Sequence, residues 1–445
     1  MTALSSRPEF HSAPQLRSAP DVPSAPDFPQ FRSVPQHGQG SGLDEADLRA
    51  LCELAELNGH LSDGVQVAKF EQEFCDYTGA EHAIAVTSCT MALELTSRVL
   101  GLGAGDEVIA SALTFQATVS SFVGSQVVVR FADIDPDTLC LDADSVARLI
   151  GPRTRAIYAV HYGGSCGDIV RLRELADRHG LYLVEDCAHA IGASADGRSA
   201  GTWGDIGCWS FHSLKNISTL GQGGMLTVRD EELAARLRRL RVIEPDAIFS
   251  GHQRSRVFGD YRVPTDPRRV THEKNAYTHD CDLIRASGLN AQLSDPAAAV
   301  GRSQLRRLPQ LLARRNELAT ILDEELADIP GVQTLPTPAG QQHARHLYAF
   351  RLVQPELSRD ALVSLLADRG IEVVLRYFPL HLLPEWRLRG CRLGDAPTTE
   401  RIWFSELVNL PLSPQLEPAD MHYMAEAVDR AVAELGGYRR ASRCA

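Results

Sequence analysis

The stretch AIYAVHYGGSCGDIVRLRELADRHGLYLVE, residues 156–185, decides the fold. Apolar runs at 156–161 and 181–185 are typical of buried strands, and the spacing at 169–178 is that of an amphipathic helix ended by Gly180. This order predicts two parallel strands joined by a covering helix. Further strand patterns at 83–86, 107–112 and 127–134, and a helix pattern at 91–100, precede it. The alternation predicts an α/β fold with a mostly parallel sheet covered by helices.

Three parts of the chain differ in composition. Residues 1–42 repeat a short Ser-x-Pro unit and end in a Gly-rich linker, which predicts a disordered tail that either docks or is inert. Residues 43–308 form the predicted large domain. A helix pattern over 295–329, broken at Pro309, leads into 309–445, where strand patterns at 346–353 and 373–377 and helix patterns at 359–369 and 421–435 predict a smaller C-terminal α+β domain.

Composition excludes several classes of protein. The 445 residues are 44% hydrophobic with a net charge of -12, which suits two globular domains and argues against a general nucleic-acid binder. No apolar run approaches 18 residues and the start lacks a secretory pattern, so we expect neither a membrane span nor export. Ten cysteines without CxxC or Cys/His metal spacing indicate free thiols in the cytoplasm. The cluster THDCD at 278–282 is weak support for a metal, and we expect no metal site.

Lysine is rare in this chain. Lys and Arg total 45, of which only Lys69, Lys215 and Lys274 are lysines, so 42 are arginines. Lys215 ends the stretch GDIGCWSFHSLK, residues 204–215, which precedes a Gly-rich segment at 221–224. A Schiff base with an aldehyde cofactor needs an amine that can lose its proton, which a guanidinium does not do. Lys215 is therefore the candidate nucleophile, and a solvated surface lysine is the alternative.

Polar or aromatic residues follow three of the predicted strands, at the edge where α/β folds bind ligands. The turn at 87–92 can hold a phosphate at a helix N-terminus, or simply cap that helix. Phe115 can stack on a flat cofactor ring, or belong to the core. Asp186 ends an apolar strand, where a carboxylate needs a cationic partner. A protonated pyridine nitrogen is such a partner, and an arginine or a helix cap is the alternative.

The order of phosphate cup, aromatic residue, strand-end aspartate and Ser-x-x-x-x-Lys resembles the fold-type I pyridoxal-phosphate enzymes, and within them the DegT/DnrJ/StrS-like sugar and cyclitol aminotransferases. Further motifs follow in that family's order, among them EDCAH at 185–189, GLN at 288–290 and YFPLH at 377–381. The resemblance covers nearly the whole chain after residue 42. It implies an aspartate-aminotransferase-like large domain with a mostly parallel seven-stranded sheet, plus the smaller domain.

The resemblance implies a role for each cofactor-site residue. Lys215 would hold pyridoxal 5'-phosphate as a Schiff base and then move the proton that yields pyridoxamine 5'-phosphate. Asp186 would pair with the pyridine nitrogen, His189 would lie near the phenolic oxygen, and Phe115 would stack on the ring. Ser210 would bind the phosphate.

Four further positions complete the implied site at its edges. The backbone amides around Thr90 and Met91 would join Ser210 at the phosphate. Asn290 or Gln292 would reach the phosphate of a partner subunit, which makes a homodimer the minimum assembly. The family's usual Tyr and Arg around this Asn are absent, so either residue could serve.

Two residues of the predicted smaller domain are candidates for substrate binding. Tyr377 and His381 are expected to face the cleft between the domains, where ligand sites commonly lie. A packed core position is the alternative for Tyr377.

The implied function is that of a cytoplasmic aminotransferase. It would take an amino group from glutamate or glutamine and deliver it to a ketone on a sugar nucleotide or a cyclitol such as an inosose, in amino-sugar or aminocyclitol antibiotic biosynthesis. One alternative is a sugar dehydratase of the same fold, in which histidine replaces the lysine. Another is a cofactor-binding regulatory or scaffold protein that docks through its Pro-rich tail. The segment 243–284 is expected to cover the substrate or bridge the dimer.

Overall fold

The computed structural model describes residues 33–35, 42–56, 61, 64–242, 246–249 and 281–437. Most of the predicted tail (1–42) and of the segment 243–284 lies outside these residues, as do the first three residues of the cluster at 278–282. The roles predicted for these segments stay predictions.

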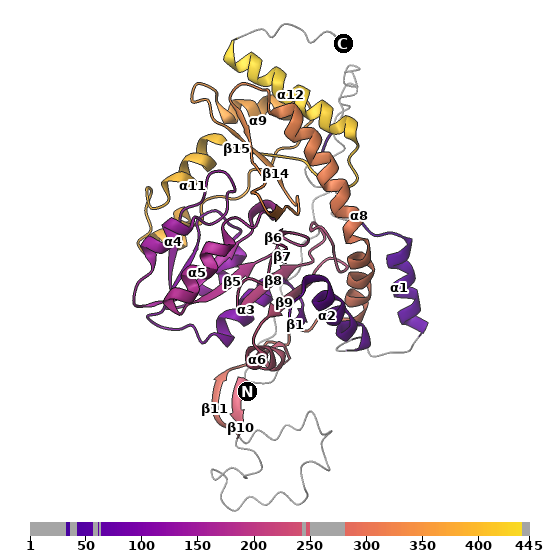
Figure 1. Ribbon diagram of the computed structural model, residues 1–445, viewed down its shortest axis with the longest axis vertical. Coiled ribbons are helices and arrows are strands. Elements are labelled where there is room, and N and C mark those ends of the chain that lie inside the picture. The colour runs from indigo at the N-terminus through magenta and orange to yellow at the C-terminus, as the bar shows by residue number, and fades with distance from the viewer. Residues whose placement is uncertain are drawn as a thin grey trace, which may run out of the picture. The chain divides into compact units, whose positions relative to one another are not determined.

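A seven-stranded sheet forms the centre of the described chain (Figure 1). Its strands, in spatial order, are β1 (His82–Val86), β9 (Gly224–Val228), β8 (Ile206–Ser210), β5 (Tyr182–Asp186), β4 (Thr154–Val160), β2 (Glu107–Ser111) and β3 (Val128–Ala132). The strands from β8 to β3 pair in parallel, whereas β9 pairs antiparallel with both β8 and β1. The predicted α/β fold with a mostly parallel sheet of seven strands is confirmed.

The strand–helix–strand unit predicted over 156–185 is present as β4, α5 (Ile169–His179) and β5. Gly180 ends α5 in the left-handed conformation, as its lack of a side chain allows. The other predicted elements of this region, including α3 (Cys89–Val99), lie within two residues of their expected bounds.

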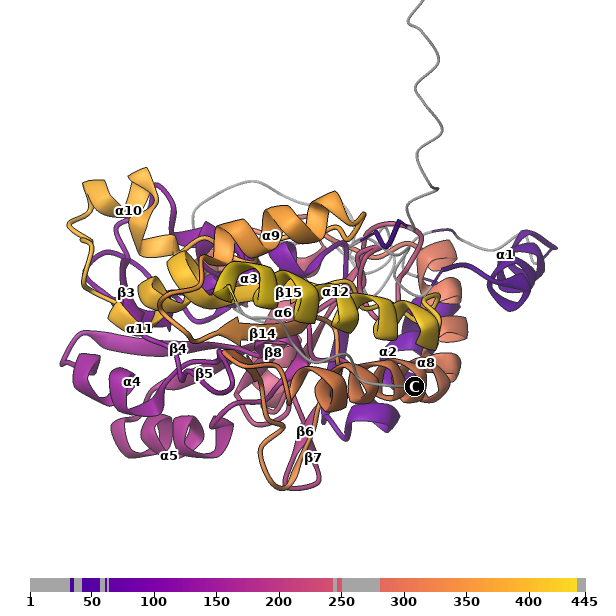
Figure 2. The same cartoon turned by 90° about the horizontal axis from the view of Figure 1, so that it is seen from above.

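Helices cover both faces of the sheet because the strand side chains alternate between the faces. Ile109 and Ile157 belong to the core shared with α2 (Val65–Thr78) and α5, whereas Val108 and Tyr158 belong to the core shared with α3. Figure 2 shows α5 on the side of the sheet opposite α3. The remaining covering helices are α4 (Ala143–Leu149) beside α5 and α6 (Glu231–Arg241) beside α3.

Four aromatic side chains fix α2 to the sheet. Phe74 lies 5.2 Å from Trp209 and 5.7 Å from Phe211, measured between ring centroids, and Phe70 lies 5.3 Å from Phe211. All four rings are at most 1% exposed. Since Phe211 directly follows β8, this cluster also supports the segment that leads to Lys215.

A second core lies around the C-terminal half of the long helix α8 (Asp295–Leu326). It contains Leu318 and Leu322 of α8 and side chains of a three-stranded antiparallel sheet, which consists of β12 (Val332–Thr334), β14 (Tyr348–Leu352) and β15 (Leu407–Leu410). The helices α9 (Arg359–Asp368) and α12 (Pro418–Gly436) complete it. These elements match the predicted strand at 346–353 and the predicted helices at 359–369 and 421–435.

Two predictions for the C-terminal part were wrong. The helix α8 is continuous through Pro309, because Leu308 and Leu312 on either side are buried against the sheet and hold the helix in place. Residues 373–377 form no strand; the amide of Arg376 donates to the side-chain oxygen of Asn409 at 3.0 Å, and β15 takes the place beside β14. The predicted domain boundary between residues 308 and 309 therefore falls inside one helix.

Shorter elements lie around these two cores. The helices are α1 (Glu45–Glu56), α10 (Pro384–Leu388) and α11 (Pro397–Arg401), with short helical turns at Gln116–Phe122, Tyr162–Gly164, Leu380–Leu382 and Ile402–Glu406. The strands β6 (Ser194–Ala195), β7 (Arg198–Ser199) and β13 (Gln341–Gln342) form a small sheet, and β10 (Asp246–Phe249) pairs with β11 (Cys281–Ala286).

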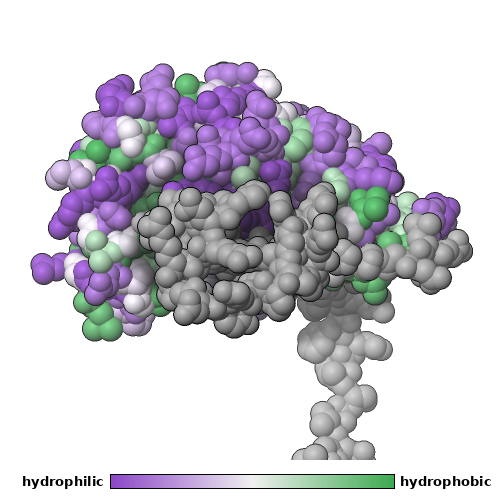
Figure 3. All heavy atoms as spheres, turned by 90° about the horizontal axis from the view of Figure 1, so that it is seen from below, coloured by the Kyte–Doolittle hydropathy of each residue, from purple (hydrophilic) through white to green (hydrophobic). Residues whose placement is uncertain are grey.

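The described helices include none that is both long enough and apolar enough to cross a membrane. On the face drawn in Figure 3, hydrophilic side chains make up most of the coloured surface, and hydrophobic ones form small separate patches.

The aromatic cluster gives a test of the fold. Phe74→Ala should reduce the free energy of unfolding by about 3 to 5 kcal/mol, because it leaves a cavity among three other rings. Urea denaturation followed by fluorescence measures the loss. The matched control Phe404→Ala removes a ring that is 46% exposed, and its loss should be much smaller. Equal losses for the two variants would contradict this account of the packing.

Candidate active site

A cavity of about 420 Å³ opens at the carboxyl ends of the parallel strands. Segments that follow β1, β2, β5 and β8 line one side, and residues from α8 and the C-terminal part line the other. The lining includes Ser88, Cys89, Thr90, Phe115, Asp186, His189, Ser210, Lys215, Arg315, His346, Arg376 and Tyr377. The structure therefore brings together seven of the eleven residues predicted for the site: Thr90, Phe115, Asp186, His189, Ser210, Lys215 and Tyr377.

Lys215 lies in a tight turn after β8, where its amide donates to the carbonyl of His212 at 2.8 Å. Burial lowers the pKa of its amine to about 8, and the positive charge of Arg376 acts in the same direction, while the carboxylate of Asp186 opposes both. About one tenth of the amine is therefore uncharged at pH 7, far more than for an ordinary lysine, and the uncharged amine is the form that acts as a nucleophile. The alternative of a solvated surface lysine is excluded, because the residue lines the cavity.

Asp186 is the last residue of β5 and is buried. Its Oδ2 accepts a hydrogen bond from the Thr118 hydroxyl at 2.7 Å, and its Oδ1 accepts from the amide of Ala188 at 3.1 Å. Both donors are neutral, so they hold the carboxylate in place without cancelling its charge. Among the described residues no arginine pairs with it, and the carboxylate can hold a protonated ring nitrogen.

His189 is buried and neutral. Burial, together with the charges of Lys215 and Arg376, holds its pKa well below the usual range. The amide of Gly163 donates to Nδ1 at 3.3 Å, so the proton of the neutral ring lies on Nε2, 3.2 Å from the hydroxyl of Tyr377. The ring can therefore donate a hydrogen bond to an oxygen in the cavity.

The two aromatic candidates lie at the cavity together. The rings of Phe115 and Tyr377 are 5.6 Å apart, and Tyr377 is nearly parallel to the ring of His189 at 5.9 Å. Phe115 is 51% exposed, which excludes the alternative of a core residue. A flat ring can pack against this aromatic wall.

The N-terminus of α3 borders the cavity through Ser88, Cys89 and Thr90. Ser88 caps the helix, and its hydroxyl accepts a hydrogen bond from the amide of Met91 at 3.2 Å. Met91 does not line the cavity, and its amide serves the cap; whether the turn also holds a phosphate stays a prediction. A Cβ on Gly224 would lie 2.5 Å from the backbone carbon of Ser88, so only glycine lets β9 approach the turn so closely.

Besides Met91, three predicted residues lie outside the cavity. The prediction for His381 was wrong: its side chain is fully buried and bonds to Glu400, with Nε2 and Oε1 2.7 Å apart. Asn290 is exposed, and Gln292 pairs with Val86 in an isolated bridge. Whether Asn290 or Gln292 reaches a partner subunit stays a prediction.

Sequence reasoning missed several residues of the cavity wall, among them Cys89, Arg315, His346 and Arg376. Arg315 is one of 42 arginines and lies within a helix, so nothing local marks it. The ring of His346 lies 4.4 Å from that of His189, and its Nδ1 donates to the side-chain oxygen of Asn216 at 3.2 Å. Burial and neighbouring charges hold the pKa of His346 well below its usual range.

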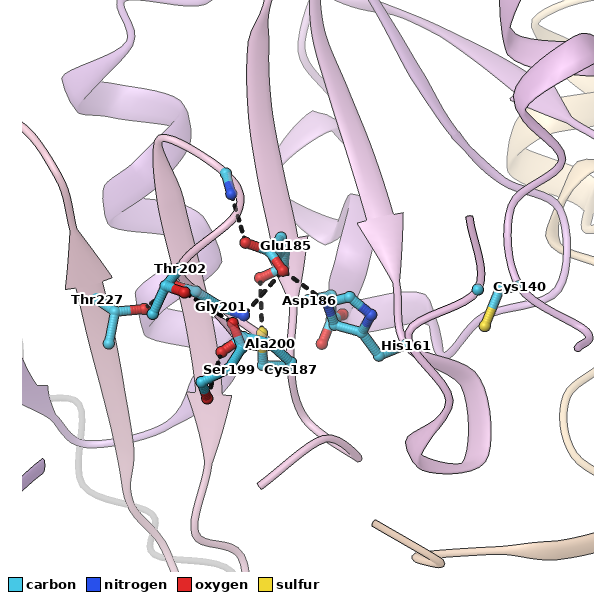
Figure 4. A network of polar contacts seen from close by, with 12 residues as sticks. Cys140, His161, Glu185, Asp186, Cys187, Ser199, Ala200, Gly201, Thr202 and Thr227 are labelled. Carbon is cyan, nitrogen blue, oxygen red and sulfur yellow. Dashed lines mark hydrogen bonds and ion pairs between the residues drawn. The ribbon is translucent and has the colours of Figure 1, made fainter. Parts of the chain in front are cut away.

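Glu185, next to Asp186 on β5, points to the opposite face of the sheet (Figure 4). Its carboxylate accepts hydrogen bonds from the amides of Gly201 at 2.8 Å and Gly204 at 2.5 Å, and from the ring of His161 at 2.8 Å. His161, Glu185 and Cys187 are the one group of possible metal ligands among the described residues. The hydrogen bond between Glu185 and the ring of His161 accounts for the short distance between these two side chains. Burial raises the pKa of the Cys187 thiol well above its usual value.

The fold and the cavity define the class of protein. A parallel sheet with a lysine of lowered pKa, a buried aspartate, an aromatic wall and a helix N-terminus at its carboxyl edge is the arrangement of the fold-type I pyridoxal-phosphate aminotransferases. The model of the DegT/DnrJ/EryC1/StrS aminotransferase family matches residues 43–429, and the chain belongs to this family. The protein is a pyridoxal-phosphate-dependent aminotransferase.

Relatives and solved structures agree with this assignment. The chain is 35% identical to dTDP-4-dehydro-2,3,6-trideoxy-D-glucose 4-aminotransferase of Saccharopolyspora spinosa, over 88% of this chain and 95% of the relative. The aminotransferase TlmJ of Streptoalloteichus hindustanus superposes with a TM-score of 0.75 at 33% identity, over 89% and 98% of the two chains. The putative sugar aminotransferase Spr1654 of Streptococcus pneumoniae, in its PMP form, gives 0.77 at 25% identity, over 91% and 100%.

The residues present fit the cofactor. The cavity offers an amine for the aldehyde in Lys215, a carboxylate for the ring nitrogen in Asp186, and an aromatic side chain for the ring face in Phe115. Thr90 and Ser210 border the helix N-terminus, which attracts a phosphate.

The scarcity of lysine makes the titration of Lys215 measurable. In the cofactor-free protein labelled with carbon-13 at the lysine ε-carbon, one of three resonances should titrate near pH 8, because burial disfavours the charged amine. The resonance that disappears in Lys215→Arg identifies the residue, and Lys69→Arg is the matched control. A midpoint near 10.5 for the resonance lost in Lys215→Arg would contradict the prediction.

The Glu185 network predicts a loss of stability on the other face of the sheet. Glu185→Ala should reduce the free energy of unfolding by about 3 to 5 kcal/mol, because it leaves two buried amides and an imidazole without an acceptor. Glu185→Gln keeps one acceptor oxygen, and its loss should be smaller. Urea denaturation of both variants measures the difference, and the prediction fails if the alanine variant is no less stable than the glutamine variant.

Proposed function

We propose that the enzyme takes an amino group from glutamate or glutamine and delivers it to a keto group of a sugar nucleotide or a cyclitol. The observation that carries the proposal is the placement of Lys215 and Asp186 in one cavity, with the amine of Lys215 held near a pKa of 8. The similarity to a dTDP-sugar 4-aminotransferase over 88% of the chain supports a sugar acceptor. A role in the cytoplasmic biosynthesis of amino sugars or aminocyclitols belongs to the same proposal.

The proposed chemistry divides between the cofactor and the chain. Bound pyridoxal phosphate supplies an aldehyde and a ring that withdraws electrons from the reacting carbon. The Asp186 carboxylate, fixed by its bonds from Thr118 and Ala188, would keep the ring nitrogen protonated. The Nε2 proton of His189 would be donated to the phenolic oxygen, and Phe115 would pack on the ring.

Lys215 moves the proton in each half of the reaction. Because its pKa is lowered to about 8, part of the amine is uncharged near neutral pH, so with the cofactor bound it would accept a proton from the donor's α-carbon and return it to the cofactor side. The reverse transfer serves the keto acceptor. Ser210 and Thr90 would hold the phosphate and so keep the reacting carbon within reach of the amine.

The proposal includes a homodimer. Asn290 is exposed and Gln292 is half-buried, and both lie outside the cavity of their own chain. Either side chain is therefore available to the site of a second copy.

A single-turnover screen tests the acceptor. Enzyme loaded with pyridoxamine phosphate is mixed with keto-sugar nucleotides, ketocyclitols and simple keto acids, and the return of the aldehyde-form absorbance is followed. At least one keto sugar or ketocyclitol should react at a rate well above the simple keto acids, and Lys215→Ala should slow this reaction at least ~1,000-fold. Reaction with keto acids alone would overturn the proposed acceptor class.

A further inference from the structure

The positive charge in the cavity exceeds the negative charge. Lys215, Arg315 and Arg376 line it, whereas Asp186 is its only carboxylate among the described residues. Asp186 faces the ring nitrogen in the proposed function, so it does not serve as a partner for Arg315. An anionic substrate group would balance this excess.

Arg315 differs from the other buried arginines of the described chain. Arg241, Arg351 and Arg359 each form an ion pair, with Glu71, Glu406 and Asp360 respectively. Arg315 is only 2% exposed, and none of the described carboxylates pairs with it. A buried charge without a partner is costly, so a residue of this kind indicates a ligand that supplies the opposite charge.

The hydrogen bonds of Arg315 leave part of its guanidinium group unused. Nη1 donates to the carbonyls of Arg345 at 3.2 Å and Leu412 at 3.1 Å, and Nε has no hydrogen-bond partner. The two carbonyls fix the plane of the group, which prepares it to bind a carboxylate. Burial lowers the pKa of Arg315 to about 10, so it stays charged at neutral pH.

The position of Arg315 indicates which anionic group it binds. Its Nη1 donates to the carbonyl of Arg345, the residue before His346, and the ring of His346 lies 4.4 Å from that of His189, so Arg315 lies on the histidine side of the cavity. The cofactor phosphate belongs at the N-terminus of α3. A diphosphate on a sugar acceptor is several bonds from the reacting carbon, whereas the carboxylate of an amino acid is one bond away. A deeply buried cation in the wall of the same cavity as the lysine therefore suits the amino donor.

From the cavity position of Arg315 and its lack of a carboxylate partner, we infer that Arg315 binds a carboxylate of the amino donor and so determines which amines the enzyme accepts. This inference rests on the proposed function for the identity of the donor, but not for that of the acceptor. Arg315 is a binding residue for the first half of the reaction.

The test uses the donor half-reaction alone. Cofactor-loaded enzyme is mixed with L-glutamate, and the loss of the aldehyde-form absorbance gives the glutamate concentration for half-maximal rate. In Arg315→Gln this concentration should rise roughly 10- to 100-fold, the range expected for a lost charge-assisted hydrogen bond. Inhibition by glutarate, a dicarboxylate without an amino group, should weaken to a similar extent.

The neighbouring residue provides the control. Arg314 lies on the same helix outside the cavity lining, where it pairs with Glu317 and Glu417. Arg314→Gln should change both constants less than about twofold. Affinity for pyridoxal phosphate should stay within about twofold in both variants, which separates a donor site from a phosphate site or a structural role.

Two outcomes would overturn the inference. One is an Arg315→Gln enzyme that saturates with glutamate as the parent does, and the other is a variant that loses the cofactor instead. If Arg315→Gln does not fold, Arg315→Lys is tested instead, since lysine keeps the charge but lacks the planar guanidinium group. Unchanged constants for glutamate and glutarate in this variant would then overturn the inference. Because no acceptor takes part, a failure of the acceptor screen leaves this result intact.

Discussion

The parallel pairing of β5 with β8 is the constraint on which the site depends. It sets Asp186 opposite Cys208, and the amide of Cys187 donates to the carbonyl of Cys208 at 2.8 Å. Both strands therefore end at the same edge, where the turn after β8 returns Lys215 to the cavity. Two groups of opposite charge, 29 residues apart in sequence (215 minus 186), become neighbours because the sheet is parallel.

The alternation of side chains along β5 gives two adjacent carboxylates different tasks. Asp186 faces the cavity, and its two neutral donors leave its charge available. Glu185 faces the other side, where it fixes the glycines of the 199–204 segment to the sheet. The hydrogen bonds of Glu185 on one face of β5 hold the strand in place, and this fixes Asp186 on the other face. A fixed carboxylate favours precise positioning of a bound ring.

Burial sets the electrostatic state of the whole cavity. It lowers the pKa of Lys215 to about 8 and keeps His189 and His346 neutral, so part of the amine is uncharged at neutral pH and the Nε2 proton of His189 can be donated. Arginine resists this effect because its intrinsic pKa is high. Burial therefore lowers the pKa of Lys215 toward neutral pH but leaves Arg315 charged. A charged arginine in the cavity wall favours the binding of an anion.

The sequence by itself determined the order of strands and helices, the rarity of lysine and the polar residues at strand ends, because these depend on local periodicity and residue chemistry. From them followed the α/β fold, and together with the resemblance to the aminotransferase family they gave seven of the residues around the cavity. Only the tertiary structure decided that α8 passes through Pro309, that His381 turns to Glu400, and that Arg315, His346 and Arg376 reach the site. These outcomes depend on contacts between distant segments, and no local pattern records such contacts.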